Sequence, residues 1–226
     1  MTKGLNIVSR LTFENIPDGA LPTSIPDENQ YSNYSYNKSG TVTVETIDGI
    51  KFIKLNSTTA KIYSPLIITD QSKKNFQAEF DVIFDSLKVD THLVSIGVVS
   101  LLNALRVVAS NNPAQGLRLI NGNNQITSYY KFENNKKYTI CVGFKDNVIS
   151  MYVDGTIIGY CYSEEFINSL NITTPSNIIL GAPLNNTSDV NVTLYGKLGN
   201  INISIGPSVK REESYTKYGI NLVSFL

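Results

Sequence analysis

The sequence predicts an all-β protein, built as a sandwich of two antiparallel sheets. Short runs of alternating or wholly apolar residues recur along most of the 226 residues, and they are rich in the β-branched and aromatic residues that strands favour. Turn-forming residues separate these runs at close intervals. Helical periodicity is nearly absent, so the chain lacks the crossover helices that parallel strands need. These observations favour an antiparallel sandwich with at most one or two short helices.

The candidate strands follow one another along the chain. They are Ile7–Phe13, Thr41–Thr46, Lys51–Leu55, Lys61–Ser64, Phe76–Asp85, His92–Val99, Leu105–Ala109, Gly116–Ile120, Gln125–Lys131, Lys137–Phe144, Val148–Val153, Thr156–Cys161, Asn177–Gly181, Val192–Lys197 and Gly199–Ile205. Asp48-Gly49 and Asp154-Gly155 predict two-residue hairpins, because both central residues of a type I′ turn have positive φ. The best helix candidate is Ser163–Leu170, whose first residue can cap the first turn.

Two of these runs predict how strands face the core. Phe76–Asp85 alternates between an apolar face and a mostly polar face, so we expect it to cover one side of a core. Val148–Val153 is apolar on both faces except for Ser150. That strand is expected to be buried from both sides or to face a partner.

The two cysteines are predicted to be free thiols. Cys141 and Cys161 lie on the first and third of three successive strands, so the strand Val148–Val153 separates them. If Phe144 faces Val148 across the first turn, Cys141 lies opposite Met151, and alternation then sends the other cysteine to the opposite face. Such a separation exceeds the Cα distance of about 7 Å beyond which a disulfide fails.

Residues 1–206 are predicted to form one domain, since sandwiches of this size often fold as a single unit. Residues 207–226 follow it as the charged connector Lys210-Arg211-Glu212-Glu213 and the apolar tail Tyr218–Leu226. The start of the chain lacks the apolar core of a secretory signal. We therefore expect synthesis without a signal peptide, which still allows export within a larger assembly such as a virion.

The charge balance excludes one class of partner. Nineteen Lys and Arg residues balance 19 Asp and Glu residues, so the formal net charge is +0. A neutral chain without a basic run is not suited to neutralise the phosphates of nucleic acid. No apolar run is long enough to span a membrane as a helix.

Several motifs carry a family resemblance. The stretch Lys137–Gly159 resembles the central hairpins of the concanavalin A-like lectin/glucanase superfamily and its laminin G-like members, where an apolar-x-apolar-Tyr-Val-Asp-Gly strand and turn recur. Ile178–Gly181 and Tyr195–Ile203 resemble the next strand and the closing strand of that family. Leu11–Glu14 and Phe76–Phe84 stand where the family has its opening strand and an early sheet strand.

The resemblance covers roughly residues 5–206 and implies a laminin G-like jelly-roll of two curved sheets. The family contains lectins, adhesion modules, glycosidases and structural or receptor-binding parts of viruses and phages. Fold alone does not choose among these functions, so the individual residues must be weighed.

The residues argue against a glycosidase. That chemistry needs two carboxylates about 5–10 Å apart around the scissile bond, and the family's glucanases place three acids on one strand. Glu79 and Asp81 supply the first two, but Ile83 or Phe84 stands at the third position. The chain also has no Trp to form a sugar platform. We therefore predict no catalytic residues and interpret this acidic strand face as an exposed polar surface.

No metal or cofactor is predicted either. His92 is the single histidine and cannot form a multi-histidine zinc site; beside Asp90, it is expected to be a surface or strand-end residue. The resemblance implies calcium as the ion to consider, because some relatives carry Asp and Asn oxygen sites. Asp146, Asp154 and Asp189 are isolated in turns, however, so no clear calcium motif is present.

Carbohydrate or partner binding is the better-supported chemistry. Sugar sites combine aromatic faces with side-chain amides, because sugar rings have apolar faces and a rim of hydroxyls. Two loop regions combine tyrosines with asparagines, and a third has asparagines without aromatic residues. The candidate binding residues are Tyr31, Tyr34, Tyr36, Asn123, Asn124, Tyr129, Tyr130, Asn185 and Asn186.

The sequence thus predicts a non-enzymatic recognition or structural module, as a subunit of a phage or other virion surface assembly that contacts glycans. The alternatives are a free-standing carbohydrate-binding lectin or adhesin domain, and third, an atypical glycoside hydrolase. Expected partners are other subunits, copies of this chain included, and host surface glycans. Nucleic acid and membrane insertion are not expected.

Overall fold

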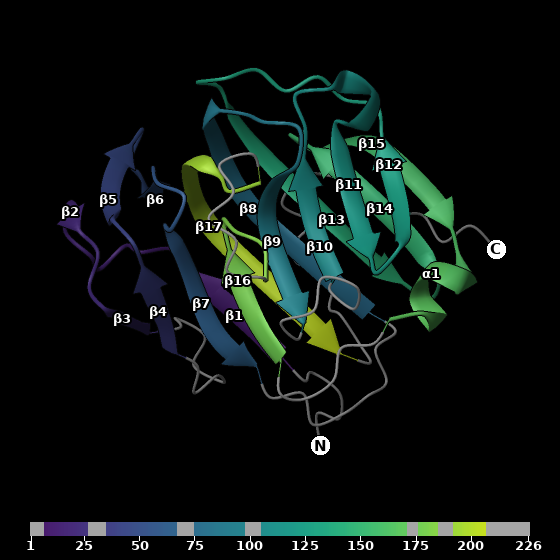
Figure 1. The fold of residues 1–226 in the computed structure, drawn as a ribbon, viewed down its shortest axis with the longest axis horizontal. Coiled ribbons are helices and arrows are strands. Elements are labelled where there is room, and N and C mark those ends of the chain that lie inside the picture. Colours follow the sequence, from purple (N-terminus) through teal and green to yellow (C-terminus); the bar gives the residue numbers. More distant parts are fainter. Residues whose placement is uncertain are drawn as a thin grey trace.

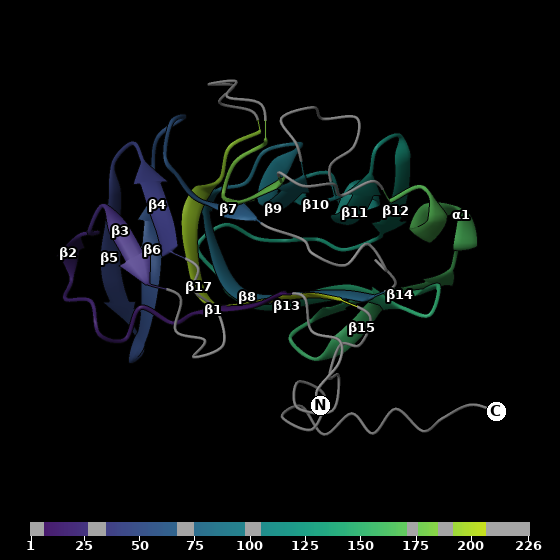
Figure 2. The same cartoon turned by 90° about the horizontal axis from the view of Figure 1, so that it is seen from below.

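A computed structural model describes residues 7–26, 35–66, 75–97, 105–170, 176–184 and 192–206, and there it confirms an antiparallel two-sheet sandwich. Figure 1 looks onto the faces of the sheets, and Figure 2 shows the two layers from the side. In the described residues, sheet A has nine strands and sheet B has eight. The two sheets are stacked face to face, and the main hydrophobic core lies between them.

Sheet A has the strand order β15-β14-β13-β8-β17-β6-β5-β2, and β1 also pairs with β17. Its strands are β1 (Ile7–Leu11), β2 (Gly19–Ala20), β5 (Val42–Ile47), β6 (Ile50–Leu55), β8 (Asn75–Ser86), β13 (Lys137–Lys145), β14 (Val148–Val153), β15 (Thr156–Tyr162) and β17 (Tyr195–Gly206). Consecutive strands β13, β14 and β15 form the hairpins that the sequence predicts.

Sheet B has the strand order β12-β11-β10-β9-β16-β7-β4-β3. Its strands are β3 (Ser24–Pro26), β4 (Ser35–Ser39), β7 (Lys61–Leu66), β9 (Thr91–Gly97), β10 (Leu105–Ala109), β11 (Leu117–Asn121), β12 (Asn124–Ser128) and β16 (Ser176–Leu180). The short strands β2, β3 and β4 are not among the strands predicted from the sequence.

The core consists of the side chains that point inward from the strands of both sheets, which are every second residue along a regular strand. On β8, Phe76, Phe80 and Phe84 are at most 1% exposed. The ring of Phe84 lies 5.3 Å from that of Phe132, which lies 5.1 Å from that of Tyr138 in an edge-to-face contact. Such aromatic pairs stabilise a core beyond the area that they bury.

The predicted strands Val192–Lys197 and Gly199–Ile205 form parts of one strand, β17. Its register against β8 shifts between Gly199 and Asn202, and Asn200 has a φ of 47°. Asp81 stabilises this bulge, because its two carboxylate oxygens accept hydrogen bonds from Asn200 Nδ2 at 2.7 Å and Thr139 Oγ1 at 2.6 Å.

The outer face of β8 differs from the prediction. Glu79 and Asp81 are only 7% and 5% exposed, so the expectation of an exposed polar strand face was wrong. Of the two expectations for Val148–Val153, burial from both sides is confirmed. Met151 packs in the core, and Ser150 on the outer face is 2% exposed.

Both cysteines are free, as predicted. The hairpin register differs by one residue from the expected one, because Lys145 rather than Phe144 pairs with Val148. Cys141 therefore lies opposite Tyr152, not Met151, and forms a small outer cluster with it. Cys161 packs against the core from the other face of the sheet.

A single short α-helix is present in the described part of the chain, α1 (Glu164–Asn168), besides the 3₁₀ turn η2 (Pro113–Gln115). Ser163 Oγ caps α1 by accepting from Phe166 N, as predicted. The helix closes the end of the sandwich near β12 and β15 (Figure 1). No helix among the described residues is long and apolar enough to cross a membrane. The jelly-roll assignment and the boundary at residue 206 stay predictions.

Two glycines of sheet A offer a matched test of its packing. A Cβ at Gly143 would lie 2.4 Å from the carbonyl oxygen of Phe76, whereas a Cβ at Gly159 would first meet the Ser128 side chain at 3.3 Å. We expect Gly143→Ala to lower the free energy of unfolding by about 1–3 kcal/mol, because overpacking forces backbone shifts. Gly159→Ala should cost clearly less. Urea unfolding measures both, and equal losses would contradict this packing.

Candidate functional site

Two arginines lie on the outer face of sheet B, the face turned away from the core. Strand alternation sends Leu105 and Val107 of β10 into the core and leaves Arg106 and Val108 outside. Arg118 of β11 pairs with Val108, so it is a diagonal neighbour of Arg106 on the same face. Diagonal neighbours are about 7–8 Å apart, within reach of long side chains.

A β-bulge adds a histidine to this face. Val94 pairs with Val107, and His92 pairs with Val108, so Leu93 is an extra residue in β9. Leu93 and Val94 both face the core. The bulge thus turns His92 outward, into one row with Val108 and Arg118; bulges re-aim side chains in this way.

The hydrogen bonds of His92 define its tautomer. Ser95 Oγ donates its only proton to the carbonyl oxygen of Ala182 at 3.0 Å, and it lies 3.2 Å from His92 Nδ1. Nδ1 must therefore donate to Ser95. Burial, and next the charge of Arg106, lower the pKa of His92 to about 4, so the ring is neutral at pH 7. Its Nε2 is then an acceptor, without a hydrogen-bond partner among the described residues.

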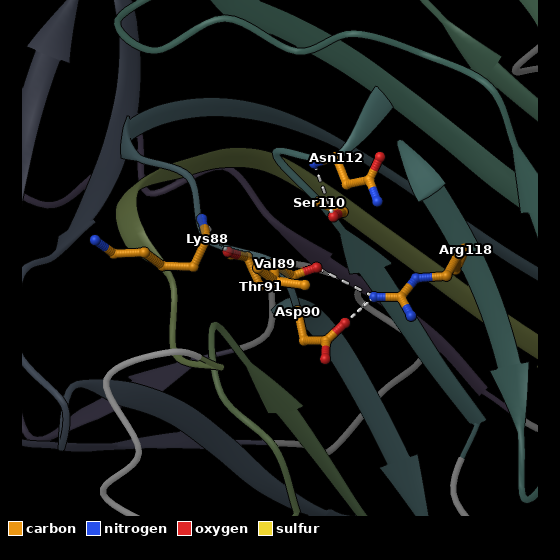
Figure 3. A network of polar contacts seen from close by, with 7 residues as sticks. All are labelled: Lys88, Val89, Asp90, Thr91, Ser110, Asn112 and Arg118. Carbon is orange, nitrogen blue, oxygen red and sulfur yellow. Dashed lines mark hydrogen bonds and ion pairs between the residues drawn. The ribbon is translucent and has the colours of Figure 1, made fainter. Parts of the chain in front are cut away.

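Arg118 reaches from β11 to the turn between β8 and β9, as Figure 3 shows. One of its Nη atoms donates to the carbonyl oxygen of Val89 at 3.3 Å and to the Asp90 carboxylate. The turn is further held by the backbone N–H of Lys88, which donates to Thr91 Oγ1 at 3.1 Å. The Arg118 side chain is only 9% exposed. Its ion pair with Asp90 therefore also fixes this turn on the sheet.

Arg106 has fewer partners. It donates from one Nη atom to the carbonyl oxygen of Gly122 at 3.0 Å. Burial, followed by the charge of Arg118, lowers the pKa of Arg106. The Nε atoms of Arg106 and Arg118 are both buried without a hydrogen-bond partner. Asp90 is the carboxylate paired with this cluster, so two arginines face one acid.

The arrangement has the chemistry of a binding site. Arg106 donates from one Nη atom only, and the neutral His92 has Nε2 as an acceptor, beside the apolar floor of Val108, which is 1% exposed. The Nε atoms of both arginines are covered by protein atoms, so a ligand would first meet the Nη atoms of Arg106. Polar groups that gain hydrogen bonds in a partly buried site contribute favourably to binding. The described residues contain no group of three or more His, Cys, Asp and Glu side chains that could hold a metal ion.

Five of the nine residues predicted as ligand contacts lie in the described part of the chain, and they are spread over several places. Tyr31, Tyr34, Asn185 and Asn186 lie outside the described residues. Tyr36 is 1% exposed, and its hydroxyl lies 2.6 Å from Ser9 Oγ inside the sandwich. Its ring is therefore not presented to a surface ligand.

The predicted residues around β12 lie at its two ends. Asn123 is exposed, and Asn124 Nδ2 donates to Ser169 Oγ beside α1 at 3.0 Å. At the other end Tyr129 is 82% exposed, whereas Tyr130 packs on the rings of Phe132 and Tyr138. Five residues of strand separate the two pairs by about 17 Å, so they do not share one small ligand.

Sequence reasoning missed both arginines and misjudged the histidine. Arg106 and Arg118 each stand alone between apolar residues of a strand, which is the available signal for an outward cation. His92 is near the start of β9, but it is 5% exposed, so the surface interpretation was wrong. A second surface was also missed: Ile157, Tyr160 and Tyr162 of edge strand β15 are 51%, 64% and 63% exposed.

Comparison with solved structures supports the fold. Domain 4 of AbnA, an extracellular arabinanase of Geobacillus stearothermophilus solved with arabinotriose, is 14% identical and has a TM-score of 0.64; the match covers 89% of this chain and 92% of that domain. The CBM40 domain of the Ruminococcus gnavus IT-sialidase, solved with α2,3-sialyllactose, is 14% identical with a TM-score of 0.54, covering 72% and 93%.

A catalytic protein is also among the similar structures. Trypanosoma rangeli sialidase in complex with the inhibitor DANA is 16% identical with a TM-score of 0.56; the match covers 87% of this chain but only 30% of the sialidase. At these identities the likeness concerns the β-sandwich alone. No protein-family model and no curated protein matches the chain.

The buried histidine predicts a pH dependence of stability. The pKa of His92 is about 4 in the folded chain, against an ordinary 6.5. The unfolded chain therefore binds a proton between these values that the folded chain does not, so stability falls as the pH drops from 6.5 towards 4. The loss attributable to His92 should reach about 3 kcal/mol at pH 4.

His92→Asn is the matched variant, because its amide can still donate to Ser95 Oγ but does not titrate. In urea titrations, we expect the unfolding free energy of the wild type to fall relative to that of the variant as the pH drops from 6.5 to 4. A difference that is constant from pH 7 to pH 4 would contradict the buried neutral histidine.

Proposed function

We propose that the chain is a non-enzymatic glycan-recognition module that binds its ligand at Arg106, Arg118 and His92, on the outer face of sheet B. The observation that carries the proposal is the hydrogen-bonding capacity that remains on this face: Arg106 uses one Nη atom, and His92 Nε2 is an acceptor without a partner among the described residues. Sugars offer hydroxyls that both donate and accept, so they match a site with both kinds of group. Rigid strands position all three side chains.

The comparisons support this class of ligand. Two of the similar structures are separate domains bound to an oligosaccharide, arabinotriose in one and sialyllactose in the other. In both, the match covers more than nine tenths of that domain, so nearly the whole of each domain corresponds to part of this chain. Binding of a glycan to this chain is the proposal that follows.

A glycosidase function is less well supported. Both oxygens of Asp81 already accept hydrogen bonds from Thr139 and Asn200, which explains that carboxylate as part of the β17 bulge. Ile83, at the third position of the acidic series in one variant of the motif, is 7% exposed. A pair of carboxylates free to act as acid and base is not found on this strand.

Glycan-array binding tests the proposed function. We expect the wild type to bind at least one glycan and Arg106→Gln to bind it at least about tenfold more weakly, because hydrogen bonds to charged groups contribute roughly 1.5–3 kcal/mol. Lys145→Gln, on β13 of the other sheet, is the control and should bind as the wild type does. Absence of wild-type binding to every glycan, or an equal loss in the control, would refute the proposal.

One observation favours a second role, as a subunit of a phage or other virion surface assembly. Strand β15 is an edge of sheet A, and it exposes Ile157, Tyr160 and Tyr162. An apolar edge strand is a ready site for pairing with another chain. The net charge of zero adds little repulsion between copies.

Self-association tests this second role. We expect the wild type to form oligomers as its concentration rises and Tyr160→Lys to shift them towards the monomer, because a lysine on an edge strand opposes pairing. Tyr129→Lys, an exposed tyrosine outside β15, serves as the control. Light scattering that shows a wild-type monomer at every concentration would rule out the edge as a contact between copies.

A further inference from the structure

We propose that the ligand of the sheet B site is an acidic sugar, whose carboxylate is bound by Arg106 and Arg118 and one of whose hydroxyls donates to His92 Nε2. This inference rests on the proposed function, because it names the chemical class of the glycan. It follows from three properties of the site: its charge, its unpaired donors and its single acceptor.

The charge of the site favours an anion. Arg106 and Arg118 are close enough to lower the pKa of Arg106 through repulsion, and Asp90 pairs with Arg118 alone. The neighbouring outward residues on the adjoining strands are uncharged: Ile120 on β11, and Gln125 and Thr127 on β12. The two arginines share the charge of Asp90, which also acts on Arg106, so one positive charge of the pair is left over among the described residues.

The donors suit a carboxylate in particular. Arg106 donates from one Nη atom only, to the carbonyl oxygen of Gly122, so the other Nη atom is left for a ligand among the described residues. Guanidinium groups bind carboxylates through such N–H donors. A neutral hydroxyl would pair the same atoms but leave the remaining positive charge uncompensated. In a partly buried site, screening by water is weak, so this difference between ligands is large.

The acceptor of the site distinguishes an acidic sugar from carboxylate ligands that have no hydroxyl. A carboxylate only accepts hydrogen bonds, so it cannot use His92 Nε2, which lacks a proton when Nδ1 donates to Ser95. The matching ligand group is a hydroxyl on the same molecule. An acidic sugar has a carboxylate and hydroxyls on one ring, whereas the carboxylate of an aspartate or glutamate in a peptide has no neighbouring hydroxyl.

Calorimetric titration with matched ligands tests the inference. The probes are methyl glucuronide against methyl glucoside, sialyllactose against lactose, and acetate as a carboxylate without hydroxyls. We expect at least one acidic sugar to bind ten times or more tightly than its neutral counterpart, with an affinity that falls as salt rises. Acetate should bind far more weakly than that sugar.

Three variants separate the contributions of the side chains. Arg106→Gln should bring the preference for the acidic sugar below about twofold, while Arg106→Lys, which keeps the charge, should retain part of it. His92→Asn keeps the hydrogen bond to Ser95 but removes Nε2, so it should weaken acidic and neutral sugars alike. Circular dichroism and thermal unfolding check that each variant is folded.

The outcomes distinguish this inference from the proposed function. Equal affinity for acidic and neutral sugars would overturn the acidic ligand and leave glycan recognition standing. Acetate binding as tightly as the acidic sugars would show an anion site without sugar recognition, which overturns the inference as well. No binding to any probe or array glycan would overturn both. An unchanged preference in Arg106→Gln would also exclude this site as its origin.

Discussion

The pairing of β8 with β17 holds the larger sheet together. β8 lies between β13 and β17, and β17 pairs on its other side with β6 along its first half and with β1 along its second. Every strand of sheet A is therefore connected through this pair. The inward faces of the two strands supply Phe80, Val82 and Leu198 to the core, so a slip in their register would expose apolar residues and bury polar ones.

Two of the bulges in the described strands show how that alternation is broken locally. At Asn200 the bulge lets one strand change partners, and the Asp81 carboxylate holds it from the neighbouring strand. At Leu93 the bulge places two consecutive residues in the core and turns His92 outward. The candidate site exists because of the second bulge, since strict alternation would send the residue before Leu93 to the other face.

Much of the fold could be predicted from the sequence because most strands from β5 to β16 bury a recognisable apolar face, and the Asp154-Gly155 turn marks the exposed strand β15. The strands that were missed, β2 to β4, are short or mostly polar, and their backbone pairing leaves little trace in composition. Tyr36 shows the same limit: it stands among Asn, Ser and Lys residues, yet it pairs with Ile25 of β3 and its ring is buried in the core. Polar neighbours in the sequence indicate a loop, but the pairing of strands far apart in the sequence decides whether such a residue lies in a loop or in a buried strand.

The site could be predicted less well, because outward positions carry no periodic signal and bulges cannot be placed from alternation. Its composition is nevertheless informative once its position is known. Val108 and Ile120 show that this face accepts apolar residues beside Arg106. Burying a charge without an ion-pair partner costs free energy, so packing alone does not require an arginine there. Arg118 differs, because it fixes the β8–β9 turn through Asp90. Arg106 also binds a turn, since it donates to Gly122 between β11 and β12. A neutral donor could make that hydrogen bond, so it is the charge of Arg106 that the proposed ligand would explain.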